Sequence, residues 1–330
     1  MCGIIGAASS RSVGKILIKG LQLMEYRGYD SAGVVLNKDE EILRLRSLGK
    51  VSKLEDLMIS KKPRALSGIA HTRWATHGAP SEENAHPHGS HDDIFIVHNG
   101  IIENHEEIRD FLRKEGYEIT SETDSELIAH LIHFYKKDTK DTLKALMRAT
   151  KDLNGAYSIA AVSQKEKGKV YAARQKSPLL VGIGIEENFI ASDPLAIVNI
   201  TEKFHMLEDG DFAVITKDDV VIFDNKGVKV DRDELKIDAT ATATTKGDYK
   251  HFMEKEIYEQ PECIGNTING RLGENDVLDN VFGLGSSDAF REVKRIHFVA
   301  CGTSLHAAKT ARKWFEDICE IPCYIDFASE

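Results

Sequence analysis

Short apolar runs separated by polar turns fill the first two-thirds of the chain. Runs at 3–8, 33–36, 65–71 and 94–98 predict β-strands. Between residues 155 and 216 five or six further short apolar runs follow, each bounded by turn residues. That spacing is typical of antiparallel sheets.

Apolar residues at helical spacing interrupt this strand pattern in three places. The first helix is predicted from residue 16 to about Arg27-Gly28, and the second from Asn104 to Lys114 with Asn104 as its N-cap. A third begins after Thr123 or Asp124, either of which would cap it. This part of the chain therefore mixes strands with a few helices.

The pattern changes in the last third of the chain. An Ala/Thr-rich stretch at 239–245 predicts a linker, a helix is expected over about 249–271, and 273–290 is expected to be a loop. A strand at 295–300, a turn at 301–304, a helix at 305–319 and a strand at 322–327 predict one βαβ unit. Such a unit buries little surface alone, so we expect a second, incomplete α/β domain. The predicted domains are 2–238, a linker and helical segment at 239–290, and 291–330.

Charge and composition narrow the classes of function. Among 330 residues, 43 are Lys or Arg and 53 are Asp or Glu, which gives a net charge of −10. An acidic chain is a poor match for nucleic acid or an anionic membrane surface. The sequence has no apolar run of about 20 residues and no signal-peptide pattern, so we expect a cytoplasmic location. Five scattered cysteines argue against a disulfide framework, and Cys319 and Cys323 are interpreted as core thiols.

Cys2 is a candidate nucleophile because of its position. A free thiol is mostly protonated at neutral pH and needs a base. If Met1 is removed, the α-amino group of Cys2, with an ordinary pKa of about 8, supplies that base. Taken alone, however, a cysteine at position 2 favours a structural role at the start of a strand.

Blocks further along the chain change this interpretation. They are CGIIG at 2–6, EYRGYDSAG at 25–33, GIAHTRWATHG at 68–78, NAHPH at 84–88, VHNGIIEN at 97–104 and SETDSE at 121–126. Together they resemble the class II glutamine amidotransferases, which are N-terminal nucleophile hydrolases. Within this family they are most similar to the branch that passes ammonia to fructose 6-phosphate. The resemblance implies an α+β fold, an αββα sandwich, followed here by an incomplete α/β sugar-isomerase domain.

The resemblance also implies roles for individual residues. Cys2 would attack the side-chain amide of glutamine, and Asn99 and Gly100 would form the oxyanion hole. Arg73 would bind the α-carboxylate and Asp124 the α-ammonium group. Further glutamine-binding residues would be Trp74, Thr76, His77, Gly78 and His86, with Arg27 in a supporting role. Each residue type also has a simpler use: Asn-Gly is a common hairpin turn, Asp is a common N-cap, and an arginine is usually a solvated charge.

Partners and cofactors follow from the same resemblance. Thr303 and Ser304, in the turn at 301–304, would contact the phosphate of fructose 6-phosphate, at a site that this chain leaves incomplete. A homodimer is expected for the whole enzyme, with no cofactor. The many histidines between 71 and 98 lack zinc-ligand spacing, so no metal is expected.

Two other functions stay open at this stage. The ammonia acceptor could be phosphoribosyl pyrophosphate or aspartate, although the Thr303-Ser304 turn disfavours both. Alternatively, the fold could be an inactive amidotransferase-like module that senses glutamine or a sugar phosphate. The presence of Cys2, Asn99 and Gly100 argues against an inactive site. We expect glutamine hydrolysis that supplies ammonia for glucosamine 6-phosphate, with this chain competent for the hydrolysis alone.

Overall fold

The computed structural model describes residues 2–28, 30–38, 41–61, 63–74, 79–237, 249–268 and 286–328. The chain forms two compact units, divided after residue 245. The predicted linker at 239–245 lies outside the described residues.

An eight-stranded antiparallel sheet forms one half of the first unit. Its strand order is β15-β11-β9-β10-β1-β4-β2-β3. The strands are β1 (Gly3–Ser9), β2 (Ser31–Asn37), β3 (Ile42–Leu48), β4 (Ser67–Arg73), β9 (Leu180–Ile183), β10 (Glu187–Ala191), β11 (Lys203–Met206) and β15 (Glu234–Lys236).

A seven-stranded antiparallel sheet packs against the first one, in the order β14-β13-β12-β8-β7-β6-β5. Its strands are β5 (His88–Ser90), β6 (Ile94–Ile102), β7 (Gly155–Ser163), β8 (Val170–Gln175), β12 (Phe212–Ile215), β13 (Val220–Phe223) and β14 (Lys229–Val230).

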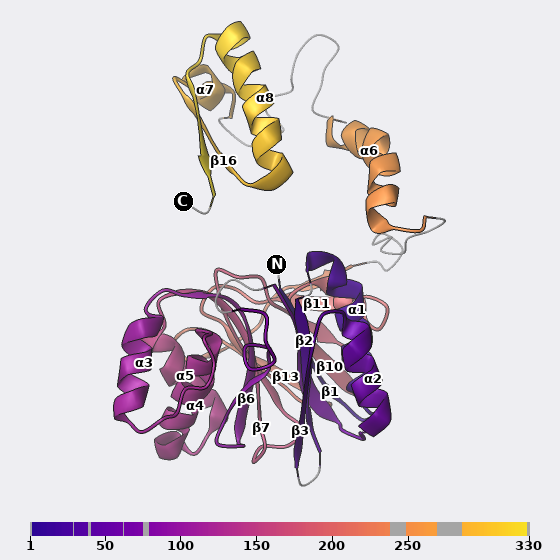
Figure 1. The fold of residues 1–330 in the computed structure, drawn as a ribbon, viewed down its shortest axis with the longest axis vertical. Coiled ribbons are helices and arrows are strands. Elements are labelled where there is room, and N and C mark those ends of the chain that lie inside the picture. Colours follow the sequence, from indigo (N-terminus) through magenta and orange to yellow (C-terminus); the bar gives the residue numbers. More distant parts are fainter. Residues whose placement is uncertain are drawn as a thin grey trace. The chain divides into compact units, whose positions relative to one another are not determined.

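Helices cover the outer faces of both sheets (Figure 1). On the first sheet lie α1 (Gly14–Met24) and α2 (Val51–Lys61), and on the second lie α3 (His105–Lys114), α4 (Ser125–Thr139) and α5 (Thr142–Ala149). Three short 3₁₀ helices, η1 (Glu25–Arg27), η2 (Thr150–Asp152) and η3 (Pro194–Ala196), complete the unit. The predicted α+β fold with two sheets between helical layers is confirmed.

Alternation along each strand explains the layers. In β1, Ile5 and Ala7 pack toward α1 and α2, whereas Ile4 and Ala8 belong to the apolar layer between the sheets. Successive side chains of a strand point to opposite faces, and both faces are covered here. The central strands of the sheets therefore appear in the sequence as continuous apolar runs.

The structure decides three points about helix caps and turns. Asn104 precedes α3 without capping it, because its side chain instead pairs with the backbone of Asp152 and Asn154 at 2.8 and 2.9 Å. Of the two residues expected to cap α4, Thr123 does so, because its Oγ1 accepts from the Glu126 backbone N–H at 3.3 Å, whereas the Asp124 side chain makes no capping hydrogen bond. Asn99-Gly100 is not a hairpin turn, since it lies within β6 and pairs with β7.

The second unit holds α6 (Phe252–Ile268), α7 (Ser286–Arg291), β16 (Ile296–Ala300), α8 (Gly302–Cys319) and β17 (Cys323–Phe327). β16 and β17 pair in parallel, so the predicted βαβ order is confirmed.

Some predicted details of the second unit are wrong. Gly302 to Ser304 form the first turn of α8 and not a separate turn. Residues 286–290 of the predicted loop belong to α7, and 273–285 lie outside the described residues. Cys323 is buried as expected, but Cys319 is exposed at the end of α8, and all five cysteines are free thiols. None of the helices in the described residues has the length and apolar character needed to cross a bilayer.

Candidate active site

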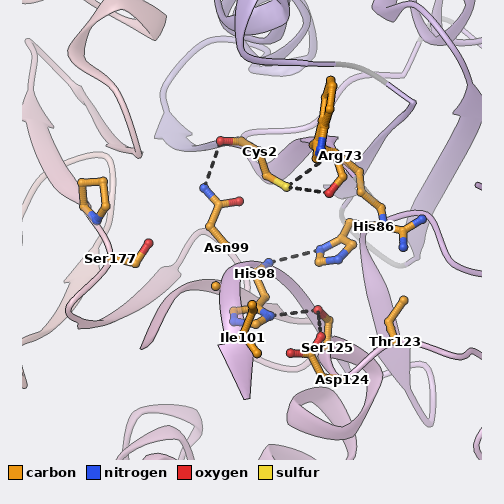
Figure 2. Close-up of a pocket in the computed structure, with 13 residues that line it drawn as sticks. Cys2, Arg73, His86, His98, Asn99, Ile101, Thr123, Asp124, Ser125 and Ser177 are labelled. Carbon is orange, nitrogen blue, oxygen red and sulfur yellow. Dashed lines mark hydrogen bonds between the residues drawn. The ribbon is translucent and has the colours of Figure 1, made fainter. Parts of the chain in front are cut away.

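A pocket of about 280 Å³ lies where the start of β1, the end of β4 and the middle of β6 meet. Figure 2 shows Cys2 at one end of its lining and Asp124 with Ser125 at the other. The lining residues are Cys2, Arg73, Trp74, His86, His98, Asn99, Gly100, Ile101, Thr123, Asp124, Ser125, Ser177 and Pro178.

Backbone contacts hold Cys2 directly before the first residue of β1. Its Sγ accepts a hydrogen bond from the Trp74 backbone N–H at 3.2 Å and lies 3.5 Å from the Trp74 carbonyl oxygen (Figure 2). Gly3 follows because a Cβ there would lie 2.8 Å from Thr72 Oγ1. Burial raises the pKa of the Cys2 thiol, and the Trp74 N–H only partly offsets this effect. The thiol is therefore protonated at neutral pH and needs a base to react.

Asn99 is held between Cys2 and a histidine. Its Nδ2 donates to the Cys2 carbonyl oxygen at 3.3 Å, and its Oδ1 lies 2.9 Å from His71 Nε2. An amide nitrogen carries two hydrogens, so one N–H of Asn99 remains for a bound molecule. A side-chain amide N–H beside the thiol is a possible donor to an anionic oxygen.

Gly100 must be glycine at this point of β6. Its φ is +131°, and a Cβ would lie 1.9 Å from the carbonyl oxygen of Ala156 on β7. A side chain would therefore collide with the paired strand as well as strain the backbone. The residue can remain in the ladder opposite Tyr157 only without a Cβ.

Arg73 and Trp74 end β4 beside the thiol. Arg73 is buried, and its Nη1 donates to the Ala79 carbonyl at 3.4 Å. The Trp74 indole is 54% exposed and packs over Gly28, where a Cβ would lie 2.2 Å from the ring. A buried guanidinium at the pocket wall is suited to a carboxylate.

Asp124 presents a buried carboxylate at the other end of the pocket. Its Oδ2 accepts from the Ile102 N–H at 2.8 Å, and its Oδ1 accepts from the Ser125 hydroxyl at 3.2 Å. The Ser125 hydroxyl also pairs with His98 Nδ1 at 2.8 Å. These contacts tie the start of α4 to β6 and explain why the carboxylate does not cap its own helix.

Buried histidines lie behind the pocket. His86 Nδ1 accepts from the His98 backbone N–H at 3.2 Å, and the His71 and His86 rings stack at 4.0 Å. Burial lowers the pKa of His71 and of His88 to about 3 each and that of His86 well below its ordinary value. These three rings are therefore neutral at physiological pH. Among the described residues no group of three or more potential ligands is arranged to hold a metal ion.

Seven residues predicted from the sequence line this one pocket: Cys2, Arg73, Trp74, His86, Asn99, Gly100 and Asp124. Thr76, His77 and Gly78 lie outside the described residues, and so does the side chain of Arg27, the last residue of η1. Thr303 and Ser304 belong to the second unit.

Several lining residues were not predicted from the sequence. His98, Thr123 and Ser125 stand inside the quoted blocks, so their position was a usable signal. Ser177 and Pro178 come from the turn after β8, where no motif marked them.

Several known proteins are similar to this chain in sequence. Residues 71–199 match the glutamine amidotransferase domain family. The chain is 50% identical over 331 aligned positions to the glutamine–fructose-6-phosphate aminotransferase (isomerizing) of Pseudomonas putida, and 47% identical to that of Vibrio parahaemolyticus. Each alignment covers 100% of this chain and 54% of the relative.

Two solved structures share the fold. One is described as the allosteric regulatory enzyme of purine biosynthesis, with a TM-score of 0.60 and 22% identity over 68% of this chain and 49% of that one. The other is glutamine phosphoribosylpyrophosphate amidotransferase from B. subtilis, with a TM-score of 0.59 and 17% identity over 98% of this chain and 65% of that one. At these identities the likeness concerns the fold alone.

The chain spans about half the length of the curated relatives that it matches. Residues 71–199 are thus similar to the glutamine amidotransferase domain family, and the chain is similar along its whole length to a part of glutamine–fructose-6-phosphate aminotransferase (isomerizing).

Proposed function

We propose that this chain hydrolyses glutamine to glutamate and ammonia, with Cys2 as the nucleophile. One observation carries the proposal: a thiol, a side-chain amide with a spare N–H, a buried guanidinium and a buried carboxylate line one pocket of about 280 Å³. These four groups belong to Cys2, Asn99, Arg73 and Asp124, respectively. The homology to glutamine amidotransferases supports the same substrate.

The reaction begins with activation of the thiol. Removal of Met1 gives Cys2 a free α-amine, which at its ordinary pKa of about 8 is partly neutral in the cell. This amine takes the thiol proton, and the thiolate attacks the side-chain carbonyl carbon of glutamine. The raised pKa of the buried thiol makes such a base necessary.

The following steps need an oxyanion site and a proton donor. The oxyanion binds the free N–H of Asn99 and the backbone N–H of Gly100, each worth about 2.7–4 kcal/mol in comparable enzymes. The protonated amine returns its proton to the leaving nitrogen, which departs as ammonia. Water then attacks the thioester, releases glutamate and restores the thiol.

Recognition of glutamine uses the two charged ends of the amino acid. Arg73 binds the α-carboxylate through its guanidinium, and the buried Asp124 carboxylate binds the α-ammonium. Contacts from Trp74, Thr76, His77, Gly78 and His86, and support from Arg27, remain predictions. Because Ile102 and Ser125 already hold the Asp124 carboxylate, it is preorganised for the cation.

We further propose that, in the whole enzyme, fructose 6-phosphate receives the ammonia and glucosamine 6-phosphate is formed. The relatives are glutamine–fructose-6-phosphate aminotransferases, which supports this acceptor. Thr303 and Ser304, in the first turn of α8, are proposed to contact the sugar phosphate, since helix N-termini favour anions. A homodimer and a cytoplasmic location belong to the same proposal.

Glutamate release tests the hydrolysis. The purified chain, with loss of Met1 verified by mass spectrometry, should release glutamate from glutamine, and Cys2→Ala should reduce the rate to background. Cys263→Ala is the matched control, because this exposed thiol lies on α6. It should retain the full rate.

Two results would contradict the proposal: no release by the processed chain, or an unchanged rate in Cys2→Ala. Glutamine binding measured by calorimetry without release would instead indicate a sensing module. Stimulation of release by fructose 6-phosphate, compared with phosphoribosyl pyrophosphate and aspartate, tests the acceptor in the whole enzyme.

A further inference from the structure

A buried histidine outside the pocket lining contacts the amide of Asn99. His71 lies in the middle of β4, where it pairs with Ile4 of β1 and Gly33 of β2, and it is 1% exposed. Its Nε2 lies 2.9 Å from Asn99 Oδ1, on the opposite side of the amide from Cys2. It cannot touch a bound substrate from there, but it can determine how the amide is turned.

The contacts of Asn99 fix which nitrogen of His71 carries the proton. The Cys2 carbonyl oxygen only accepts hydrogen bonds, so the atom of Asn99 that faces it at 3.3 Å is the nitrogen. The Asn99 oxygen therefore faces His71 and needs a donor. His71 supplies one only as the tautomer with hydrogen on Nε2.

The other ring nitrogen shows that packing alone does not explain this histidine. His71 Nδ1 is buried and has no hydrogen-bond partner among the residues that the structure describes. A buried polar atom without a partner is unfavourable, and an apolar residue would avoid that cost. The ring stacks on His86 at 4.0 Å, and this contact helps to keep Nε2 directed at Asn99.

We propose that His71 is a positioning residue that orients the Asn99 amide with its nitrogen toward Cys2 and the oxyanion. Without its Nε2–H the amide can turn over, and a carbonyl oxygen would then face the oxyanion and repel it. The inference rests on the proposed glutamine hydrolysis for its kinetic consequence, but not for its geometry. Because burial keeps the imidazole neutral, one of its nitrogens is always free of hydrogen, and the choice of tautomer matters.

The kinetic test compares two substitutions of His71. His71→Leu removes the donor, whereas His71→Gln can place an amide N–H near the former Nε2. His71→Leu should lower kcat for glutamate release by about 10- to 100-fold, with KM within about 3-fold, because the oxyanion exists only after binding. His71→Gln should stay within about 5-fold of the unmutated kcat.

A double-mutant cycle with Asn99→Ala separates positioning from general damage to the fold. Asn99→Ala should lower kcat by about 100-fold. In the Asn99→Ala background, His71→Leu should lower kcat by less than about 2-fold, because no amide remains to be oriented. The proposal would be overturned if His71→Leu lowered kcat equally with and without Asn99→Ala. It would also be overturned if His71→Gln had the same low kcat as His71→Leu at the same Tm.

A measurement without catalysis distinguishes failure of this inference from failure of the proposed function. Long-range ¹H–¹⁵N correlation spectra of the full chain, labelled at histidine, report the tautomer of each ring. The His71 resonances are assigned by their absence in His71→Gln. They should show hydrogen on Nε2 and a bare Nδ1, and the Nδ1–H tautomer would refute the proposal even in an active enzyme.

Discussion

Gly100 shows how a single position controls both folding and chemistry at this site. Alanine there would combine a φ of +131° with a Cβ 1.9 Å from the Ala156 carbonyl oxygen. We expect Gly100→Ala to lower the free energy of unfolding by about 2–4 kcal/mol and kcat by about 100-fold, because β6 and its N–H must move. Denaturant unfolding and glutamate release measure the two effects.

Gly116→Ala is the matched control for this prediction. Gly116 also has a positive φ, +82°, but a Cβ there would meet nothing within 4 Å. It should cost only the backbone strain of about 1 kcal/mol and leave kcat unchanged. If both variants lose the same stability, the close approach of Ala156 is unimportant.

Individual site residues could be predicted where they lie at the N-terminus or within a recognisable sequence block. Cys2 and the blocks around Arg73, Asn99 and Asp124 could be found from the sequence, and they line one pocket. The hydrogen-bond partners could not be predicted in the same way. Asp124 looked like a helix cap, but its carboxylate accepts from Ile102 on β6, a contact that requires the tertiary fold.

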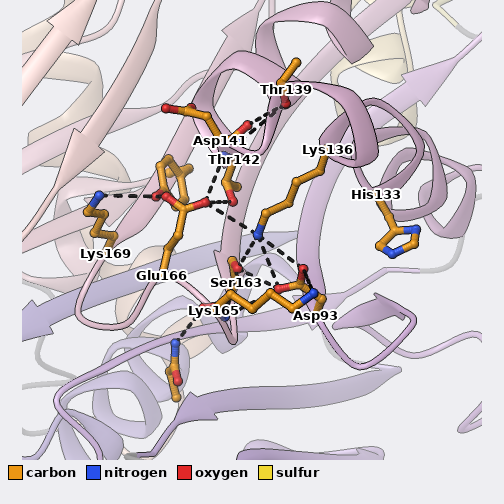
Figure 3. A network of polar contacts seen from close by, with 12 residues as sticks. Asp93, His133, Lys136, Thr139, Asp141, Thr142, Ser163, Lys165, Glu166 and Lys169 are labelled. Carbon is orange, nitrogen blue, oxygen red and sulfur yellow. Dashed lines mark hydrogen bonds and ion pairs between the residues drawn. The ribbon is translucent and has the colours of Figure 1, made fainter.

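At the scale of elements, a buried ion-pair network fastens the C-terminal end of α4 to the sheet (Figure 3). Lys136 Nζ contacts Ser163 Oγ at 2.6 Å, Asp93 at 3.3 Å and Glu166 at 3.5 Å. Asp93 comes from the turn before β6, and Glu166 from the turn after β7. The network therefore joins α4 to two turns at the ends of neighbouring strands.

Removal of the lysine should be strongly destabilising. Lys136→Met leaves the Asp93 carboxylate, which is 6% exposed, with only the largely exposed Lys165 ammonium at 3.5 Å in place of a buried cation. We expect a loss of about 3–5 kcal/mol in the free energy of unfolding, measured with denaturant. Lys217→Met, which breaks an exposed 2.9 Å pair with Asp218, should cost less than about 1 kcal/mol. Similar losses in both variants would show that burial does not strengthen the network.

The same elements predict a dependence of stability on pH. Burial alone would raise the pKa of Asp93 and of Glu166, but hydrogen bonds from Ser163 and Thr142, and the Lys136 charge, outweigh it and lower both pKa values. A carboxylate with a lowered pKa in the folded state stabilises the fold above its unfolded pKa of about 4. This contribution is lost as the pH falls through the folded pKa.

Unfolding curves between pH 7 and pH 3 test this prediction. The free energy of unfolding should fall once the pH is below about 4.5, where the unfolded carboxyl groups begin to bind protons. Asp93→Asn should be less stable at pH 7 and should lose less on acidification. A variant with the same acid slope as the unmutated chain would show that Asp93 is not a source of it.

Elements were predictable where long apolar runs or a helical period marked them. The runs at β1, β4 and β6 and the period at α1 and α4 were sufficient. The strand β3 was missed because it is an edge strand that alternates apolar residues with Arg44 and Arg46, so it has no continuous apolar run. The helices α2 and α5 were missed as well.

At the scale of the whole molecule, strand order is the part that the sequence left open. β1 pairs with β4 on one side and with β10 on the other, so Ile5 lies opposite both Ala70 and Ala191. Apolar runs of similar composition could pair in many orders. The order is decided by which faces the helices and the second sheet bury together.

The division of the chain leads to a final prediction. All residues of the three apolar clusters and of the pocket lie before residue 238, within the first unit. A chain that ends at Thr245 should therefore unfold cooperatively, with a Tm within about 2–4 °C of that of the first transition in the full chain. Its kcat for glutamate release should stay within about 2-fold. Calorimetry and the glutamate assay check both, and the Cys2→Ala version of the short chain is the blank. A 10-fold loss of kcat at an unchanged Tm would mean that residues 246–330 contribute directly to the glutamine site, since loss of folding could not explain it.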